Sequence, residues 1–100
     1  MKKVEEMLVI TMEECGELTQ ACSKYIRTKG RAKYRQNLRD EIGDVMCMIE
    51  ILKMAGLVTE EQIQTRMEDK AKKLKKWSKI FDEEESSSKT SGSPREIEGI

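Results

Sequence analysis

Apolar residues recur along most of the chain with the spacing of amphipathic helices. From about Lys2 to Arg27 they return at intervals of three, four and seven residues, at Val4, Leu8, Cys15, Leu18, Cys22 and Tyr25. This spacing places them on one face of a helix with 3.6 residues per turn. It predicts a first helix over about 2–27, and Gly30 is suited to end it.

A second apolar stripe predicts a helix from about Leu38 to Ala55, ended by Gly56. Its members are Leu38, Ile42, Val45, Met48, Ile49 and Leu52. The segment 30–37 between the two stripes is polar, basic and aperiodic, and it predicts a connecting loop.

A third helix is predicted to start at Thr59. The run Thr59-Glu60-Glu61-Gln62 fits a capping box, in which the hydroxyl and the glutamine three residues later satisfy free backbone N–H groups. Its stripe is Ile63, Met67, Ala71, Leu74 and Phe81, with Trp77 beside it.

The composition changes after Phe81. Residues 82–100 are acidic, then Ser-rich, and include the only proline, Pro94, which predicts a flexible, disordered tail. Residues 1–81 are predicted to form one domain. Without strand alternation or a glycine-rich phosphate loop, the fold class is all-α, a helical bundle of three main helices with room for a short fourth.

The small size of the domain predicts association. Eighty residues are near the limit at which a single chain buries enough surface to be stable. We therefore expect oligomerisation to complete the bundle, as a homodimer or a dimer of dimers.

Charge and cysteine usage limit the partners. Nineteen basic residues balance nineteen acidic ones, so no nucleic acid partner is expected. Seven Lys or Arg between residues 24 and 39 either steer an anionic substrate or form a solvated loop, and the solvated loop is the simpler interpretation. No run suits a signal peptide or a membrane span. The three cysteines form no C-x-x-C pair and are expected to be buried thiols in a reducing compartment, which predicts a cytoplasmic protein.

Four carboxylates occupy positions where a core helix would carry apolar residues. At 100° per residue, Glu14 falls within about 40° of Ile10 and Leu18, inside the first stripe, and Glu17 lies about 60° to the side. The second helix repeats the pattern with Glu41 in mid-stripe and Asp44 about 60° away.

Such a group of carboxylates is costly to bury unless a cation neutralises it. An unpaired buried carboxylate costs several kcal/mol, and bundle cores do hold metals on inward-facing acids. The chain has no histidine, and ligands that are all oxygen favour Mg²⁺, with Mn²⁺ as a substitute. The alternative is that each carboxylate lies on a solvated face. This alternative explains any single one of them well, but it explains less well why all four occur in a matched pattern on two helices.

Basic residues on the third helix are candidates for phosphate binding. Lys70 lies in mid-stripe, with Arg66 and Lys73 at its edges. A lysine beside a carboxylate–metal cluster suits a phosphate, whereas the alternative is an ammonium group that reaches past apolar surface to water.

The acidic motifs resemble those of a known family. The run Glu13-Glu14-Cys15-Gly16-Glu17, then twenty-three residues, then Glu41-Ile42-Gly43-Asp44 resembles the E-E-x-x-E and E-x-x-D signature of the MazG-like all-α NTP pyrophosphohydrolases. The resemblance covers about residues 5–80. It implies Mg²⁺ ligation by Glu14, Glu17, Glu41 and Asp44, and phosphate contact by Lys70. Glu13 matches the first motif position, where its role is to bind metal, orient water or support the site.

The implied reaction is attack of water at the α-phosphate of an NTP or dNTP, which gives the monophosphate and pyrophosphate. Carboxylates around the site, Glu13 and Glu41 among them, are the candidates for catalysis. Two other functions remain open. One is a non-catalytic helical interaction module, and the other is a hydrolase of another phosphorylated nucleotide.

Overall fold

The computed structural model describes residues 1–82 and contains three α-helices and no strand within them. They are α1 (Lys3–Arg27), α2 (Ala32–Met54) and α3 (Glu60–Trp77). The all-α class with three main helices is confirmed. The chain divides into two compact units, the first being Met1–Val58 and the second starting at Thr59. The predicted tail 83–100 lies outside the described residues.

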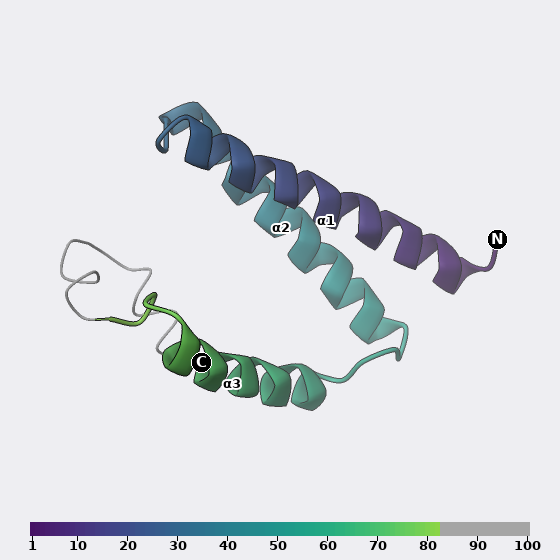
Figure 1. Ribbon diagram of the computed structural model, residues 1–100. Helices are drawn as coiled ribbons and strands as arrows, with labels where there is room; N and C mark the ends of the chain where they lie inside the picture. Colours follow the sequence, from purple (N-terminus) through teal and green to yellow (C-terminus); the bar gives the residue numbers. More distant parts are fainter. Residues whose placement is uncertain (83–100) are drawn as a thin grey trace. The chain divides into compact units, whose positions relative to one another are not determined.

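The first unit is a hairpin of α1 and α2. Figure 1 shows the two helices running antiparallel, joined by a short turn. Their contact follows the predicted stripes only in part. Ala21 and Met48 are the buried apolar residues and half-buried ones flank them, but Val4, Leu8 and Ile42 of the predicted stripes are exposed. These half-buried residues include Met7, Ile10, Leu18, Tyr25, Leu38, Val45 and Leu52.

The turn between α1 and α2 depends on Gly30. Its N–H donates to the Tyr25 carbonyl at 2.9 Å, and its φ of 76° is one that glycine adopts without a Cβ penalty. At the end of α1 Lys29 is left-handed as well, with φ 56°, whereas at the end of α2 Gly56 alone is, with φ 83° and a bond of 3.1 Å from the Leu57 N–H to the Leu52 carbonyl. Both glycine assignments are confirmed.

The segment 30–37 was wrongly predicted to be a loop, because α2 begins six residues before Leu38, at Ala32. Lys, Arg and Gln are good helix formers, and no breaker follows Gly30 to stop them. Side-chain hydrogen bonds also stabilise the first turns of α2. The Arg35 guanidinium donates to the Gly30 carbonyl at 2.8 Å, and the Gln36 amide donates to the Asp40 carboxylate at 2.8 Å.

The N-terminus of α3 matches its prediction. The Gln62 N–H donates to the Thr59 hydroxyl at 3.1 Å, while the Thr59 N–H donates to the Gln62 side chain at 3.0 Å. This reciprocal pair is a capping box, and it satisfies two N–H groups that the helix itself leaves free.

The prediction that the cysteines are buried is wrong. Cys15, Cys22 and Cys47 are all exposed and free. In a two-helix hairpin each helix covers only one narrow side of the other, so apolar positions away from the contact line stay uncovered. Within residues 1–82 no helix combines the length and the apolar character needed to cross a membrane.

The two glycines allow a matched test of the turn. We expect Gly30→Ala to destabilise the protein more than Gly56→Ala. Both changes put a Cβ at positive φ, which costs about 1–2 kcal/mol. A Cβ at residue 30, however, would also lie 3.0 Å from the Tyr25 hydroxyl oxygen, whereas a Cβ at residue 56 meets nothing within 4 Å.

Urea unfolding followed by circular dichroism measures the loss in the free energy of unfolding for both variants. Tyr25→Phe, combined with Gly30→Ala, should recover only part of the excess loss, since it removes the hydroxyl oxygen but leaves the ring carbon Cζ, 3.1 Å from the new Cβ. Equal losses for the two alanine variants would contradict this account of the turn.

Candidate metal and active site

The hairpin brings acidic side chains of α1 and α2 together. Glu14, Glu41 and Asp44 each offer a carboxylate oxygen, and these oxygens all lie within 4.8 Å of one another. Glu14 and Glu41 are half-buried and Asp44 is exposed. We call these three residues the carboxylate cluster.

Helical periodicity explains why the two glutamates meet. Glu14 and Glu41 lie in the middle of the stripes through which α1 and α2 pack, so each points at the other helix. Asp44 follows Glu41 by three residues, nearly one turn, and therefore lies beside it on α2.

Two carboxylate oxygens in the cluster lack a protein partner. Oε1 of Glu14 and Oε1 of Glu41 are both buried, and neither has a hydrogen-bond partner. A buried oxygen of this kind is costly when it is left unpaired. Two of them that face the same small space form a good pair of ligands for a hard divalent cation.

The electrostatics of the cluster also favour a cation. Desolvation raises the pKa of Glu14 above its ordinary value, and the negative charges of Glu17, Asp44 and Glu13 raise it further. The pKa of Glu41 is raised first by desolvation and then by the charges of Glu17 and Asp44. A bound divalent ion would reverse both effects, because it favours the ionised carboxylates.

Glu17 lies next to the cluster and on the side of α1 that Asp44 approaches from α2. It is exposed, and its negative charge contributes to the raised pKa of Glu41. Glu13 is also exposed, and its charge acts on Glu14 alone of the two raised glutamates. Three of the four predicted ligands therefore form the carboxylate cluster, and Glu17 and Glu13 act on it through their charges.

The predicted phosphate-binding residues belong to the other unit. Lys70, Arg66 and Lys73 lie on α3 and are exposed, and the carboxylate cluster draws on α1 and α2 alone. Lys70 shares its side of α3 with the half-buried Ile63 and Leu74, as its mid-stripe position predicts.

Sequence reasoning found every carboxylate of the cluster, but it missed how unequal their surroundings are. The helical positions separated Glu14 and Glu41 from Glu17 and Asp44 by about 60°. That separation becomes a difference in burial, with the first pair half-buried and the second pair exposed.

Taken together, the fold and the cluster define an all-α protein in which two helices present facing carboxylates, an arrangement that holds divalent cations in helical bundles. The chain belongs to the MazG family, since the model of the MazG nucleotide pyrophosphohydrolase domain matches residues 2–79. This match confirms the resemblance seen in the acidic motifs. Searches of curated proteins and of solved structures found no match.

The raised pKa values predict how stability depends on pH without metal. A glutamate whose pKa is higher in the folded state than the unfolded value of about 4.3 binds its proton more tightly when folded. Its contribution to stability is complete below pH 4.3 and is lost as the pH rises through the folded pKa. In EDTA, we therefore expect the contribution of Glu14 and Glu41 to the free energy of unfolding to fall as the pH rises above this value.

Thermal unfolding with EDTA or Mg²⁺, from pH 4 to pH 8, measures this effect. Glu41→Gln should stabilise the metal-free protein at pH 8 and should reduce the stabilisation by Mg²⁺. Glu6→Gln, which removes an exposed carboxylate of α1, serves as the control and should leave both unchanged. A metal-free Glu41→Gln protein that is less stable than the wild type at pH 8 would refute the account.

Proposed function

We propose that this protein is a Mg²⁺-dependent pyrophosphohydrolase that converts an NTP or dNTP to NMP or dNMP and pyrophosphate. One observation carries the proposal: the carboxylate cluster, with two buried oxygens left unpaired, in a chain of the MazG family. A helical interaction module would have no use for two unpaired carboxylates at its packing seam.

The cluster fits magnesium better than other common metals. Glu14, Glu41 and Asp44 would hold the ion through oxygen alone, and Glu17 would complete the ligand set from the exposed side. Oxygen ligands suit Mg²⁺, with Mn²⁺ as the expected substitute, whereas zinc favours nitrogen and sulfur. The bound ion would polarise the phosphate oxygens and lower the pKa of the attacking water.

The acidic residues have different roles in the proposed reaction. In the reaction, a water oxygen bonds to the α-phosphorus, the bond from that phosphorus to the oxygen bridging to the β-phosphate breaks, and pyrophosphate leaves with that oxygen. A carboxylate must accept the proton that the water loses. Glu13 is the candidate base, because it is exposed beside Glu14 and lies outside the carboxylate cluster. Glu41 acts as a ligand and, by its charge, orients the water.

The basic residues of α3 are proposed to bind the phosphate chain. Lys70 would neutralise the β- and γ-phosphates as a point charge, and Arg66 and Lys73 would add to the positive potential. These residues are the natural choice because the hairpin site itself is acidic and a triphosphate needs cations in addition to the metal. The free thiols suit a reducing compartment, so we place the activity in the cytoplasm.

The first test is product release from a panel of NTPs and dNTPs. We expect pyrophosphate and monophosphate with Mg²⁺ and neither product with EDTA. Glu41→Gln should reduce kcat/KM by at least about 100-fold, since even groups behind a metal's ligands are worth 10–100-fold.

Glu50→Gln is the matched control on the same helix. Glu50 pairs with Lys53 on the surface and lies outside the carboxylate cluster, so this variant should keep full activity. Release of free phosphate instead of pyrophosphate would favour a hydrolase of another phosphorylated nucleotide. No turnover by a folded protein that binds no Mg²⁺ would favour the interaction module.

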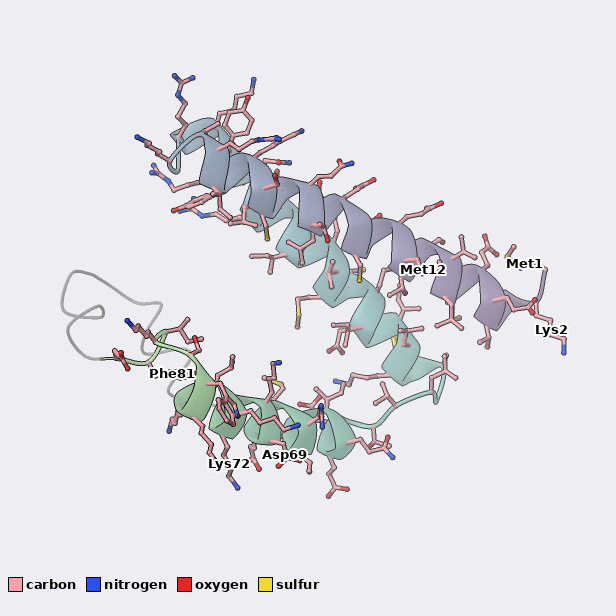
Figure 2. The ribbon with its side chains drawn as sticks, viewed as in Figure 1. Met1, Lys2, Met12, Asp69, Lys72 and Phe81 are labelled. Carbon is pink, nitrogen blue, oxygen red and sulfur yellow. The ribbon has the colours of Figure 1, made fainter. Side chains whose placement is uncertain are left out.

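A second test concerns Lys70. Lys70→Met should lower kcat/KM by about tenfold to a hundredfold, because hydrogen bonds to charged groups contribute about 1.5–3 kcal/mol. Lys72→Met is the control: both residues are exposed lysines on α3, but Lys72, labelled in Figure 2, lies about 160° away from Lys70 around the helix. The same loss in both variants would show general electrostatic attraction and not a contact made by Lys70.

A further inference from the structure

The seven basic residues around the turn between α1 and α2 form one surface of the folded hairpin. Two of them lie in the last turn of α1, and most of the others lie in the first turns of α2, so all are within about 12 Å of the turn along the hairpin axis. Figure 2 shows side chains ending in nitrogen gathered around this turn, at the end of the hairpin opposite the N-terminus. We call this surface the basic tip. Its members are Lys24, Arg27, Lys29, Arg31, Lys33, Arg35 and Arg39.

The basic tip has no carboxylate to balance its charge. No acidic residue occurs between Glu17 and Asp40. All seven basic residues are exposed, and within residues 1–82 none of them forms an ion pair. Asp40, the first acid of α2, accepts a hydrogen bond from Gln36 instead.

The charge of the chain is therefore strongly separated. Of the nineteen basic residues seven belong to the tip, which leaves twelve in the rest of the chain against all nineteen acidic ones. The neutral balance of the whole chain, from which no nucleic acid partner was predicted, hides this separation. A cationic end on an otherwise acidic protein directs that end toward a polyanion.

The start of α2 is an unfavourable place for cations. The free N–H groups give a helix N-terminus a partial positive charge, so acids stabilise it and cations destabilise it. The other helices follow this rule, since α1 has Glu5 and Glu6 in its first turn and α3 has Glu60 and Glu61. By contrast, α2 has neither an acid in its first turn nor a side-chain cap, and it has Lys33 there.

Helix formation alone does not explain the basic tip. Lys and Arg are good helix formers, but Glu is equally good, and the start of α2 would favour it. The lysines at the end of α3, such as Lys75 and Lys76, differ in this respect, because they lie where the helix dipole favours cations. A cluster of cations that lowers the stability of its own helix indicates a surface that binds an anion.

Three arginines form a regular row along α2. Arg31, Arg35 and Arg39 follow at intervals of four residues, so each lies about 6 Å further along the helix and about 40° around it. The row spans about 12 Å, a length over which one DNA strand presents about four phosphates. A guanidinium group can donate two parallel hydrogen bonds to one phosphate. The middle of the row is held in place, because Arg35 also donates to the Gly30 carbonyl at 2.8 Å.

The other side chains of the tip favour a duplex over a membrane or a single strand. A helix that binds a membrane surface adds aromatic and large apolar residues to its cations, and a single strand stacks its bases on exposed aromatic rings. Tyr25 and Tyr34 are both half-buried, and the Lys33 ammonium lies 5.5 Å from the centre of the Tyr34 ring. Among residues 24–39, Ile26 alone is a large apolar residue with an exposed side chain.

We propose that the basic tip binds the phosphate backbone of double-stranded nucleic acid without reading its sequence. About four of the seven cations can face one duplex, since Lys33, for example, lies about 160° from Arg35 around α2. Release of counterions from the duplex drives the binding. The proposal does not rest on the proposed catalytic function, because no residue of the tip belongs to the carboxylate cluster or to α3.

Fluorescence anisotropy of a labelled DNA duplex of about 20 base pairs tests the proposal. The full chain is used in EDTA, so that no metal ion bridges the DNA and the carboxylates. We expect a dissociation constant of about 1–100 µM at physiological salt, the range of sequence-independent binding. With four phosphate contacts, the affinity should fall about 150-fold between 50 mM and 200 mM salt. Duplexes of unrelated sequence should bind alike.

The double variant Arg31→Gln, Arg39→Gln removes two contacts and keeps good helix formers. It should bind at least tenfold more weakly at 50 mM salt, and the effect of salt should shrink to about 12-fold. Its thermal stability should not fall, because Arg31→Gln removes a cation from the positive end of α2. Lys2→Gln with Lys3→Gln is the matched control, since it removes the same charge from exposed residues at the other end of the hairpin. This control should bind like the wild type.

Several results would overturn the proposal. No binding of the duplex at 50 mM salt would refute it directly. Unchanged binding by the Arg31→Gln, Arg39→Gln variant, with a loss on Lys72→Gln and Lys76→Gln, would place the contact on α3. Displacement of the duplex by polyglutamate of equal charge would indicate an acidic protein as the partner. Tighter binding to vesicles of anionic lipid than to the duplex would indicate a membrane surface.

The Glu41→Gln variant separates this proposal from the proposed function. It should bind the duplex like the wild type in EDTA, whether or not the protein hydrolyses nucleotides. Binding that appears only with Mg²⁺ and is lost in Glu41→Gln would instead place the nucleic acid at the carboxylate cluster and contradict a role for the tip.

Discussion

The repulsion between facing carboxylates at the packing seam of α1 and α2 is the constraint on which the rest of the structure depends. Glu14 and Glu41 occupy positions that would otherwise hold leucine, and each has a buried oxygen without a partner. Desolvation and neighbouring charges raise the pKa of both, so the seam is least stable when both are ionised. A bound divalent cation would instead be stabilised by the same oxygens.

The weakness of the hairpin core follows from this arrangement. Glutamates occupy two of the central contact positions, and within residues 1–58 Ala21 and Met48 are the only buried hydrophobic residues. A small domain that places carboxylates at core positions needs stability from another source, such as a bound ion or contact with other helices. Exposed apolar residues such as Leu8, Met12 and Ile42 provide surface for such contact.

The helices also show which structural features the sequence pattern predicts correctly and which it does not. The two terminal glycines and the capping box at Thr59 are local signals, and the structure agrees with them. The stripes predicted the helices, but Val4, Leu8 and Ile42 are exposed. The predicted start of α2 was wrong because hydrophobic periodicity gives no signal where a helix buries none of its faces. Residues 32–37 are helical through backbone propensity and the Arg35 contact to the Gly30 carbonyl, not through an apolar stripe.

The sequence by itself determined the three helices, the pairing of Glu14 with Glu17 and of Glu41 with Asp44 on their own helices, and the family to which those motifs belong. Each of these depends on spacing within one helix, which the period of 3.6 residues sets. Only the tertiary structure decided that oxygens of Glu14, Glu41 and Asp44 approach within 4.8 Å and that the cysteines are exposed. Distances and burial depend on how one helix packs on another, and the register across that seam is not encoded in either helix alone.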